Sequence, residues 1–245
     1  MKKYILSLCA LLLIPQLVLA QGYIATYTMK VSNVPEFAKS MDGLMASDWG
    51  QEFPGYVSLT HYAFNGYDDA THAVIINYED EAQMAKGTEM FYEPTFGAFL
   101  AKTSPYTEAV EQSLHMKLIS GGDSDADKNN IYTVYRMKVK DPASYAKEYA
   151  KVTKAQEDSG NMDGGYGLRA QIAGNNSYYS HYAFVGNSSL LSAMEGQQKL
   201  YASDSFQKFN KAVAGNRELI QTSTIVVLSL SITTLAAVPS TSIPQ

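Results

Sequence analysis

The stretch YIATYTMKV at residues 23–31 occurs again, changed but recognisable, as IYTVYRMKV at residues 131–139. Both copies alternate between apolar and polar residues with a period of two, which is typical of a β-strand with one face in a core. Further pairs follow at offsets of 108 to 110 residues: Asn33 with Asp141, His72 with His181, and Tyr92 with Tyr201. So regular a repeat predicts two similar structural units, one after the other.

Each unit is predicted to contain strand, helix, two strands, helical segment and strand. Asn33 and Asp141 have the side chains preferred at helix N-caps, so a helix is expected after each. The first unit has predicted strands at 22–31, 55–65, 71–79 and 107–119, and a helical segment over 80–103. The second has predicted strands at 130–139, 165–173, 178–186 and 217–231, and a helical segment over 188–213. The order βαββαβ is that of a ferredoxin-like unit, so the predicted fold class is α+β with two such units in tandem.

The first twenty residues have the pattern of a secretory signal peptide. Lys2 and Lys3 form a basic start, an apolar run follows, and Ala20 ends a site with small residues. We therefore expect residues 1–20 to be removed and the protein to be periplasmic or secreted, without a membrane partner afterwards. Cys9, the one cysteine, lies in this segment, so the exported chain has no thiol nucleophile and no cysteine metal ligand. The other predicted segments are repeat 1 at 21–120, a polar linker at 121–129, repeat 2 at 130–231 and a C-terminal tail at 232–245.

The charge pattern argues against several kinds of partner. The chain has 24 acidic and 19 basic residues with no dense cluster of Lys or Arg, so nucleic acid is not expected as a partner. The four histidines lie on separate predicted elements without the spacing of a metal site, and no metal or cofactor is expected. The acidic stretch at 123–127 resembles the start of a calcium loop, but Lys128 stands where such a loop needs glycine.

The segments YEPTFGAFLAK at 92–102 and YASDSFQKFNK at 201–211, with the two strand openings, resemble the dimeric α/β-barrel superfamily. That superfamily includes antibiotic-biosynthesis-type monooxygenases, stress-responsive barrel proteins and heme-degrading proteins. The resemblance implies two ferredoxin-like sheets that close into one barrel, here within a single chain, as a monomer or a homodimer. Heme-degrading members use an Asn, a Trp and a His around the porphyrin. In the alignment of the two repeats, Trp49 corresponds to Glu157 or Asp158 of the second unit. No complete set of Asn, Trp and His can be aligned onto this chain.

Strand alternation sorts the candidate site residues. His61 shares a face with Val57 and Leu59, and the repeat alignment gives these three the counterparts Gly167, Arg169 and Gln171. One interpretation places His61, Arg169 and Gln171, with His72 or His181, in a polar patch inside the barrel. There an arginine would orient an anionic or enolised substrate and a histidine would accept a proton.

The alternative interpretation is structural. His72 and His181 occupy matched strand ends in both units, where a histidine can bind the backbone or water. His115 is expected to be a structural strand histidine. Tyr62, Arg136 and Gln171 are candidate ligand contacts in the same barrel cavity.

Two functions remain open from the sequence. The first is an exported small-molecule-binding module that uses an aromatic-lined barrel cavity, in keeping with 18 tyrosines in the chain. The second is a cofactor-independent monooxygenase or isomerase acting on a small aromatic or enolisable substrate. In such an enzyme the protein would supply positioning and a base.

Overall fold

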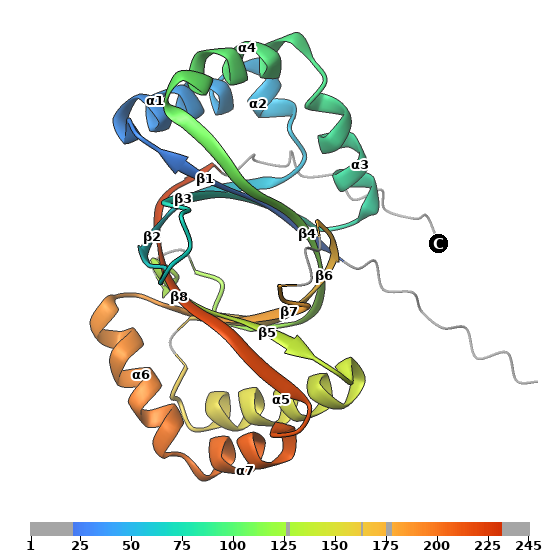
Figure 1. Ribbon diagram of the computed structural model, residues 1–245, viewed down its shortest axis with the longest axis vertical. Helices are drawn as coiled ribbons and strands as arrows, with labels where there is room; N and C mark the ends of the chain where they lie inside the picture. Colours follow the sequence, from blue (N-terminus) through green and yellow to red (C-terminus); the bar gives the residue numbers. More distant parts are fainter. Residues whose placement is uncertain (1–21, 126–127, 163, 175–177, 232–245) are drawn as a thin grey trace, which may run out of the picture.

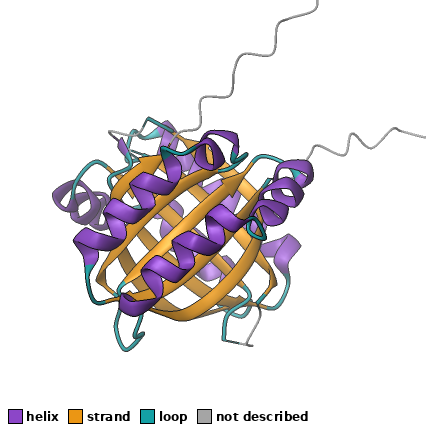
Figure 2. Cartoon of the chain, turned by 90° about the horizontal axis from the view of Figure 1, so that it is seen from above, coloured by secondary structure: helices purple, strands orange, loops and turns teal. Residues whose placement is uncertain are grey.

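The computed structural model describes residues 22–125, 128–162, 164–174 and 178–231. The predicted signal peptide and C-terminal tail lie outside these ranges. Within them, eight strands form a closed antiparallel barrel in the order β1-β3-β2-β8-β5-β7-β6-β4 (Figure 1). Helices cover the outside of the barrel on two opposite sides (Figure 2). The predicted α+β class and the closed barrel are therefore confirmed.

The elements of the first half are β1 (Tyr23–Val31), α1 (Val34–Met45), α2 (Asp48–Glu52), β2 (Tyr56–Phe64), β3 (His72–Tyr78), α3 (Glu81–Met90), α4 (Pro94–Thr103), a 3₁₀ turn (Ser104–Tyr106) and β4 (Thr107–Gly122). The elements of the second half are β5 (Ile131–Val139), α5 (Pro142–Asp158), β6 (Gly165–Ala173), β7 (His181–Asn187), α6 (Leu190–Ala202), α7 (Asp204–Val213) and β8 (Arg217–Ser231). The strands end within three residues of the predicted positions.

The helices begin where the sequence provides caps. The side chain of Asn33 accepts a hydrogen bond from the backbone N–H of Glu36, and that of Asp141 accepts one from Ser144. The first helix ends at Met45, before Trp49. Ser47 instead caps a separate short helix, α2, and Trp49 lies in it.

Strand pairing is equivalent in the two halves. Met29 on β1 pairs with His72 on β3, and Met137 on β5 pairs with His181 on β7. Each half forms a four-stranded sheet, β4-β1-β3-β2 in the first and β8-β5-β7-β6 in the second. The two sheets join along β2–β8 and β4–β6, so no strand of the barrel is left as an open edge.

Each sheet packs one face against its own helices. Phe37 and Leu44 of α1 are buried against Leu59 and Ile76 in the first half, and Tyr145 and Val152 of α5 are buried against Leu168 in the second. Since side chains alternate along a strand, the neighbouring residues point into the barrel interior, here called the lumen.

The lumen is filled differently from its two sides. On adjacent strands of the first half, three small side chains stand at one level: Thr28, Ala73 and Thr60. The equivalent level of the second half carries three large ones: Arg136, Tyr182 and Arg169. All six residues except Tyr182 have an exposed fraction of 6% or less. Long side chains from the second half thus fill the space that the first half leaves.

Candidate functional site

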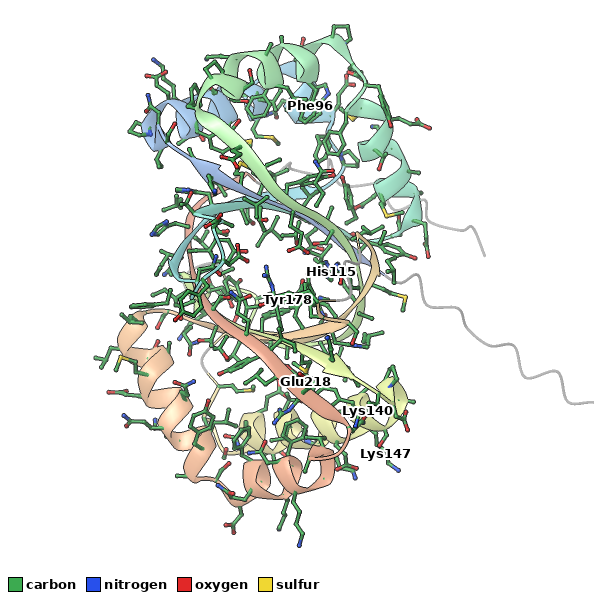
Figure 3. The ribbon with its side chains drawn as sticks, viewed as in Figure 1. Phe96, His115, Lys140, Lys147, Tyr178 and Glu218 are labelled. Carbon is green, nitrogen blue, oxygen red and sulfur yellow. The ribbon has the colours of Figure 1, made fainter. Side chains whose placement is uncertain are left out.

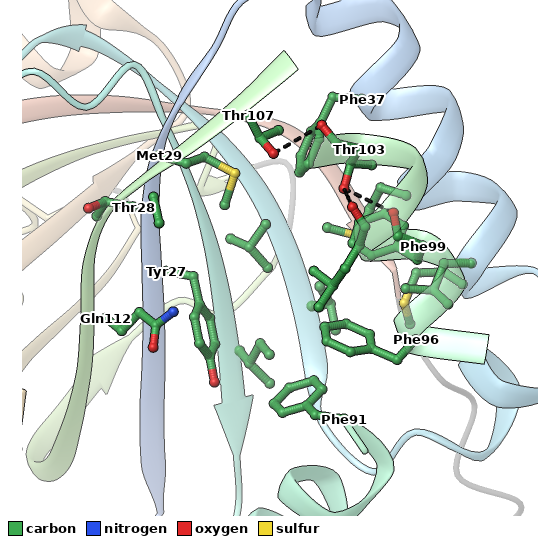
Figure 4. A pocket seen from close by; sticks show the side chains of 18 of the residues that line it. Tyr27, Thr28, Met29, Phe37, Phe91, Phe96, Phe99, Thr103, Thr107 and Gln112 are labelled. Carbon is green, nitrogen blue, oxygen red and sulfur yellow. Dashed lines mark hydrogen bonds between the residues drawn. The ribbon is translucent and has the colours of Figure 1, made fainter. Parts of the chain in front are cut away.

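Two cavities lie outside the barrel wall, between each sheet and its helices. The first cavity, of about 270 Å³, lies between α1, α2 and α4 and the outer face of β1 and β3 (Figure 4). Its walls are mainly apolar, and the described lining includes seven aromatic side chains: Tyr27, Phe37, Trp49, Phe53, Phe91, Phe96 and Phe99. A cavity with these walls favours a flat apolar molecule over a charged one.

Trp49 is the centre of the aromatic wall. Its indole Nε1 donates a hydrogen bond to the carbonyl of Met90 at 3.0 Å, which fixes the plane of the ring. Phe53 and Phe96 stack on the indole with centroid distances of 4.9 and 5.4 Å. The short helix α2 carries Trp49 into this position, and Gly50 permits it, because a Cβ there would clash with the carbonyl oxygen of Met45.

Few polar groups line the first cavity. Thr103 and Thr107 donate their hydroxyl hydrogens to the carbonyls of Phe99 and Thr103, both at 3.0 Å, so these hydroxyls are already engaged (Figure 4). Tyr27 and Gln112 are paired across β1 and β4 and carry two further polar ends. Burial raises the pKa of Tyr27, so the phenol stays protonated and can donate a hydrogen bond.

The second cavity, of about 390 Å³, lies between α5, α6 and α7 and the outer face of β5 and β7. It is lined by more polar groups than the first, among them Tyr135, Tyr145, Tyr149, Gln156, Gln207, Asn210 and Arg217. Burial raises the pKa of Tyr135 to about 12, so its phenol is neutral at physiological pH. Burial also raises the pKa of Tyr145, while the charge and hydrogen bond of Arg217 act in the opposite direction.

The predicted ligand contacts Arg136 and Tyr62 lie in the lumen and contact each other. Arg136 donates from Nη1 to Asp68 Oδ2 at 3.2 Å and to Gln221 Oε1 at 3.1 Å, and from Nη2 to the Tyr62 hydroxyl at 3.4 Å. Burial alone would lower the pKa of Arg136, but the surrounding oxygens raise it above its ordinary value. These donors are therefore used within the protein, and Arg136 closes one end of the lumen.

Arg169 is also in the lumen, but it has no carboxylate partner among the described residues. Its Nη1 donates to the carbonyls of Ile119 and Leu168, and its guanidinium lies 5.0 Å from the centre of the Phe184 ring. Burial lowers the pKa of Arg169. Gln171, two residues on, uses its amide to donate to the carbonyl of Gly174.

The histidines occupy two different environments. His61 and His72 lie on the helix side of the barrel wall with ring centroids 5.2 Å apart, and His72 shares a 2.9 Å contact with the Thr71 hydroxyl. His181 has the equivalent contact with Ser180, also at 2.9 Å. His115 points into the lumen, where its Nε2 lies 3.0 Å from the Tyr179 hydroxyl (Figure 3).

The prediction that His61 and a matched histidine share a polar patch with Arg169 and Gln171 inside the barrel is wrong. His61 pairs with His72, and it is Ala170 that occupies the equivalent position opposite His181. The true counterpart of His61 is therefore Ala170, one residue before Gln171. Because a shift of one residue reverses the face of every side chain, Arg169 and Gln171 lie in the lumen while His61 and both matched histidines lie outside it. Whether any of these residues has a chemical role stays a prediction.

Two features of the site were not found from the sequence. One is that these two cavities lie between the sheets and the helices, outside the barrel wall. The other is the importance of Trp49. The sequence did contain one signal of this aromatic wall. Phe96 and Phe99 are three residues apart, so they share one face of α4, near Phe37.

Comparison with known proteins identifies the fold. No protein-family model matches the chain, and no curated protein matches it. A protein proposed to be a monooxygenase, from Lactobacillus acidophilus NCFM, superposes with a TM-score of 0.60 at 10% identity over 87% of this chain and 97% of its own. The chain has the dimeric α/β-barrel fold.

Two further proteins of known structure share this fold but are named for different functions. An anthrone oxidase-like protein has a TM-score of 0.57 at 9% identity, covering 86% of this chain and 92% of its own. A heme-binding protein from Thermus thermophilus has a TM-score of 0.50 at 9% identity, with the same coverage. Identities this low establish the dimeric α/β-barrel architecture alone, so the ligand must be argued from the cavities themselves.

The residues of the two cavities do not fit heme. Iron in heme is held by an axial His, Cys, Met or Tyr ligand. No histidine or cysteine is among the residues described as lining either cavity. The buried phenol of Tyr149 is committed to the carbonyl of Gly167 at 3.0 Å, and burial raises its pKa, so it is a poor source of phenolate. The methionines of the first cavity pack in its apolar core.

Proposed function

We propose that this protein binds a small, flat, largely apolar molecule of one or two aromatic rings in the first cavity. The observation that carries the proposal is the wall of stacked rings around Trp49. Small-molecule sites are concave and mostly apolar, with a few polar groups that fix orientation, and typically measure about 300–1,000 Å³. The first cavity, at about 270 Å³, lies just below that range and so suits a small ligand. Tyr27 and Gln112 supply the orienting groups.

The origin and location of the protein belong to the same proposal. We infer that the chain is a tandem duplication of a ferredoxin-like unit, because the strand pairing of one half repeats that of the other. We also infer that the protein works outside the cytoplasm, on the signal-peptide pattern of residues 1–20. No helix within the described ranges is long and apolar enough to cross a membrane.

A second candidate function is oxidation of the bound molecule without a cofactor. The observation that favours it is that proteins of the same fold are described as a proposed monooxygenase and as anthrone oxidase-like. The ionised substrate would itself react with oxygen, and the protein would need a base. Glu111 is the one carboxylate among the described lining residues, and its Oε1 already accepts a hydrogen bond from Tyr179 in the lumen at 3.2 Å. Binding without turnover is therefore the better supported function.

Tryptophan fluorescence tests the proposal directly, because Trp49 is the one tryptophan of the chain. Titration with 1,4-naphthoquinone, a flat quencher, is expected to reduce Trp49 emission to saturation. Ala109, which pairs with Met29 and lines the cavity, provides a blocking position: Ala109→Phe is expected to abolish the quenching. Ala101→Phe, on an exposed site of α4, is the control.

Each outcome of this titration bears on one of the two functions. Absence of saturable quenching in the unaltered protein, or equal quenching in Ala109→Phe, would contradict the proposal. Oxygen consumption with an anthrone or naphthol substrate, lost in Ala109→Phe and kept in Ala101→Phe, would favour the oxidase alternative.

A further inference from the structure

We propose that the second cavity is a separate site, selective for a flat aromatic molecule that carries a carboxylate or sulfonate group, and that Arg217 binds this anionic group. The inference rests on the proposed function in one respect, since both hold that the spaces between sheet and helices accept ligands. The second site differs from the first in the half of the molecule that forms it, in its lining residues and in the charge of its ligand.

Arg217 lies at the start of β8, where the strand pairs with Val139 of β5 at the edge of the second cavity. Its side chain is half-buried. Nη2 donates to Asn210 Oδ1 at 2.9 Å, and the guanidinium carbon lies 5.4 Å from the centre of the Phe209 ring. Both contacts hold the guanidinium in place, and neither supplies a negative charge.

The charge of Arg217 is not balanced by a neighbouring acid. In the part of the chain that the structure describes, no carboxylate lies within 4.0 Å of its guanidinium. A guanidinium carries five donors in a planar fork that matches a carboxylate or sulfonate. A half-buried guanidinium that is fixed by neutral partners and faces a cavity is therefore suited to an anion from solution.

The groups around Arg217 reinforce this selectivity. Tyr135 and Tyr145 line the same cavity, and burial raises the pKa of both, so their protonated phenols offer donors to an anion. Phe206, Phe209 and Leu200 supply an apolar slot for a ring beside the guanidinium. A charge-assisted hydrogen bond next to an apolar wall is about twice as strong as a neutral one.

The first cavity has the opposite character. Its described lining includes no Lys, Arg or His, and its one ionisable acid, Glu111, would repel an anion. The first cavity therefore disfavours an anion and the second accepts one, although they occupy equivalent places in the two halves of the barrel.

A pair of fluorescent probes separates the two sites. 8-Anilinonaphthalene-1-sulfonate and N-phenyl-1-naphthylamine share one ring skeleton and differ by the sulfonate. Arg217→Gln is expected to weaken binding of the sulfonate probe at least about tenfold, which is the effect of losing one charge-assisted contact, and to leave the neutral probe within about twofold. Lys211→Gln, on the exposed side of α7, removes the same charge nearby and is expected to change neither probe.

Further variants separate a lost contact from a lost fold. Arg217→Lys keeps the charge without the fork and is expected to bind the sulfonate probe with intermediate affinity. Far-ultraviolet circular dichroism and the melting temperature of Arg217→Gln show whether the fold is intact. If Arg217→Lys binds the sulfonate probe as weakly as Arg217→Gln, the charge is not what selects the ligand and the inference is wrong.

The outcomes distinguish this inference from the function proposed for the first cavity. Unchanged affinity of the sulfonate probe in Arg217→Gln overturns the inference, as does loss of that probe in Ala109→Phe instead. If Ala109→Phe leaves the quenching by 1,4-naphthoquinone unchanged while Arg217→Gln loses the sulfonate probe, the second site stands and the function proposed for the first cavity fails.

Discussion

Nη1 of Arg136 lies 3.2 Å from Oδ2 of Asp68, and this ion pair connects β5 of the second half to the loop between β2 and β3 of the first. The two side chains are 7% and 20% exposed, so water screens the pair little. Gln221, which also contacts Arg136, donates to the backbone carbonyl of Asn65 in the same loop at 2.9 Å. One buried guanidinium thus holds a loop of the first half over the end of the lumen.

The first prediction concerns that ion pair. Asp68→Asn is expected to lower the free energy of unfolding by about 3 kcal/mol, because it leaves the charge of Arg136 buried without its carboxylate. Urea denaturation measures the change. Asp69→Asn is the matched control: its pair with Lys30 is exposed and screened by water, so a clearly smaller loss is expected. Equal losses in the two variants would show that burial does not strengthen the Arg136 pair.

The second prediction concerns pH and His115, which is 1% exposed. Burial, together with the positive charges of Arg136 and Arg169, lowers the pKa of His115 to about 4. In the unfolded chain the pKa is about 6.5, so the unfolded state binds the proton more readily. The stability that neutral His115 contributes is therefore complete above pH 6.5 and is lost as the pH falls towards 4, by about 3 kcal/mol in all.

His115→Gln tests this prediction. The variant keeps a hydrogen-bonding group next to Tyr179 but cannot titrate, so its free energy of unfolding is expected to fall less steeply between pH 6.5 and 4. Burial also lowers the pKa of His72 and of His181, and both remain in the variant, so the difference between the two curves reports His115. Parallel curves would mean that His115 is protonated as readily in the folded protein as in the unfolded chain.

The third prediction concerns Gly167 in the lumen. A Cβ at this position would lie 2.6 Å from Nη1 of Arg169, 2.7 Å from Cε1 of Phe184 and 2.8 Å from the carbonyl oxygen of Ile119. Gly167→Ala is expected to destabilise the protein by about 1–3 kcal/mol through overpacking. Gly43→Ala, in an exposed position of α1 with no atom within 4 Å, is expected to stabilise it by up to about 1 kcal/mol. Thermal unfolding of both variants compares the two glycines, and a gain in both would contradict the packing described for Arg169.

The fourth prediction concerns Trp49. Trp49→Phe removes the indole N–H and leaves the carbonyl of Met90 without that donor in a buried site. A loss of about 1–3 kcal/mol in the free energy of unfolding is expected. Chemical denaturation followed by circular dichroism measures it, since the variant has no tryptophan fluorescence. No loss would indicate that water satisfies the Met90 carbonyl when the indole is absent.

Much of the fold was predictable because it is written in local patterns. The period-two alternation of residues 23–31 and 131–139 predicted β1 and β5, and Asn33 and Asp141 predicted the helix starts that follow. The tetrapeptide HYAF at 61–64 in β2 recurs at 181–184 in β7, so this identity does not mark equivalent strands of the two units.

The site was less predictable because it depends on single-residue register. Aligning His61 with Gln171 instead of Ala170 placed His61 in the lumen beside Arg169, whereas it lies on the helix side of the barrel wall, although every strand was assigned correctly. The sequence also could not show that the large side chains of β5, β6 and β7 fill the lumen, because that depends on how the two sheets face each other. The polar interior of the barrel follows from that packing, whereas the two cavities lie outside it, between the sheets and the helices.

The unequal filling of the lumen has a consequence for how the two halves can pair. Thr28, Ala73 and Thr60 face a row of Arg136, Tyr182 and Arg169, so each half supplies what the other lacks. A barrel made from two copies of the first half would be hollow at this level, and one made from two copies of the second would crowd its arginines together. If the chain were divided at the linker, a first half should therefore pair only with a second half. Neither half should form a symmetric barrel with a copy of itself.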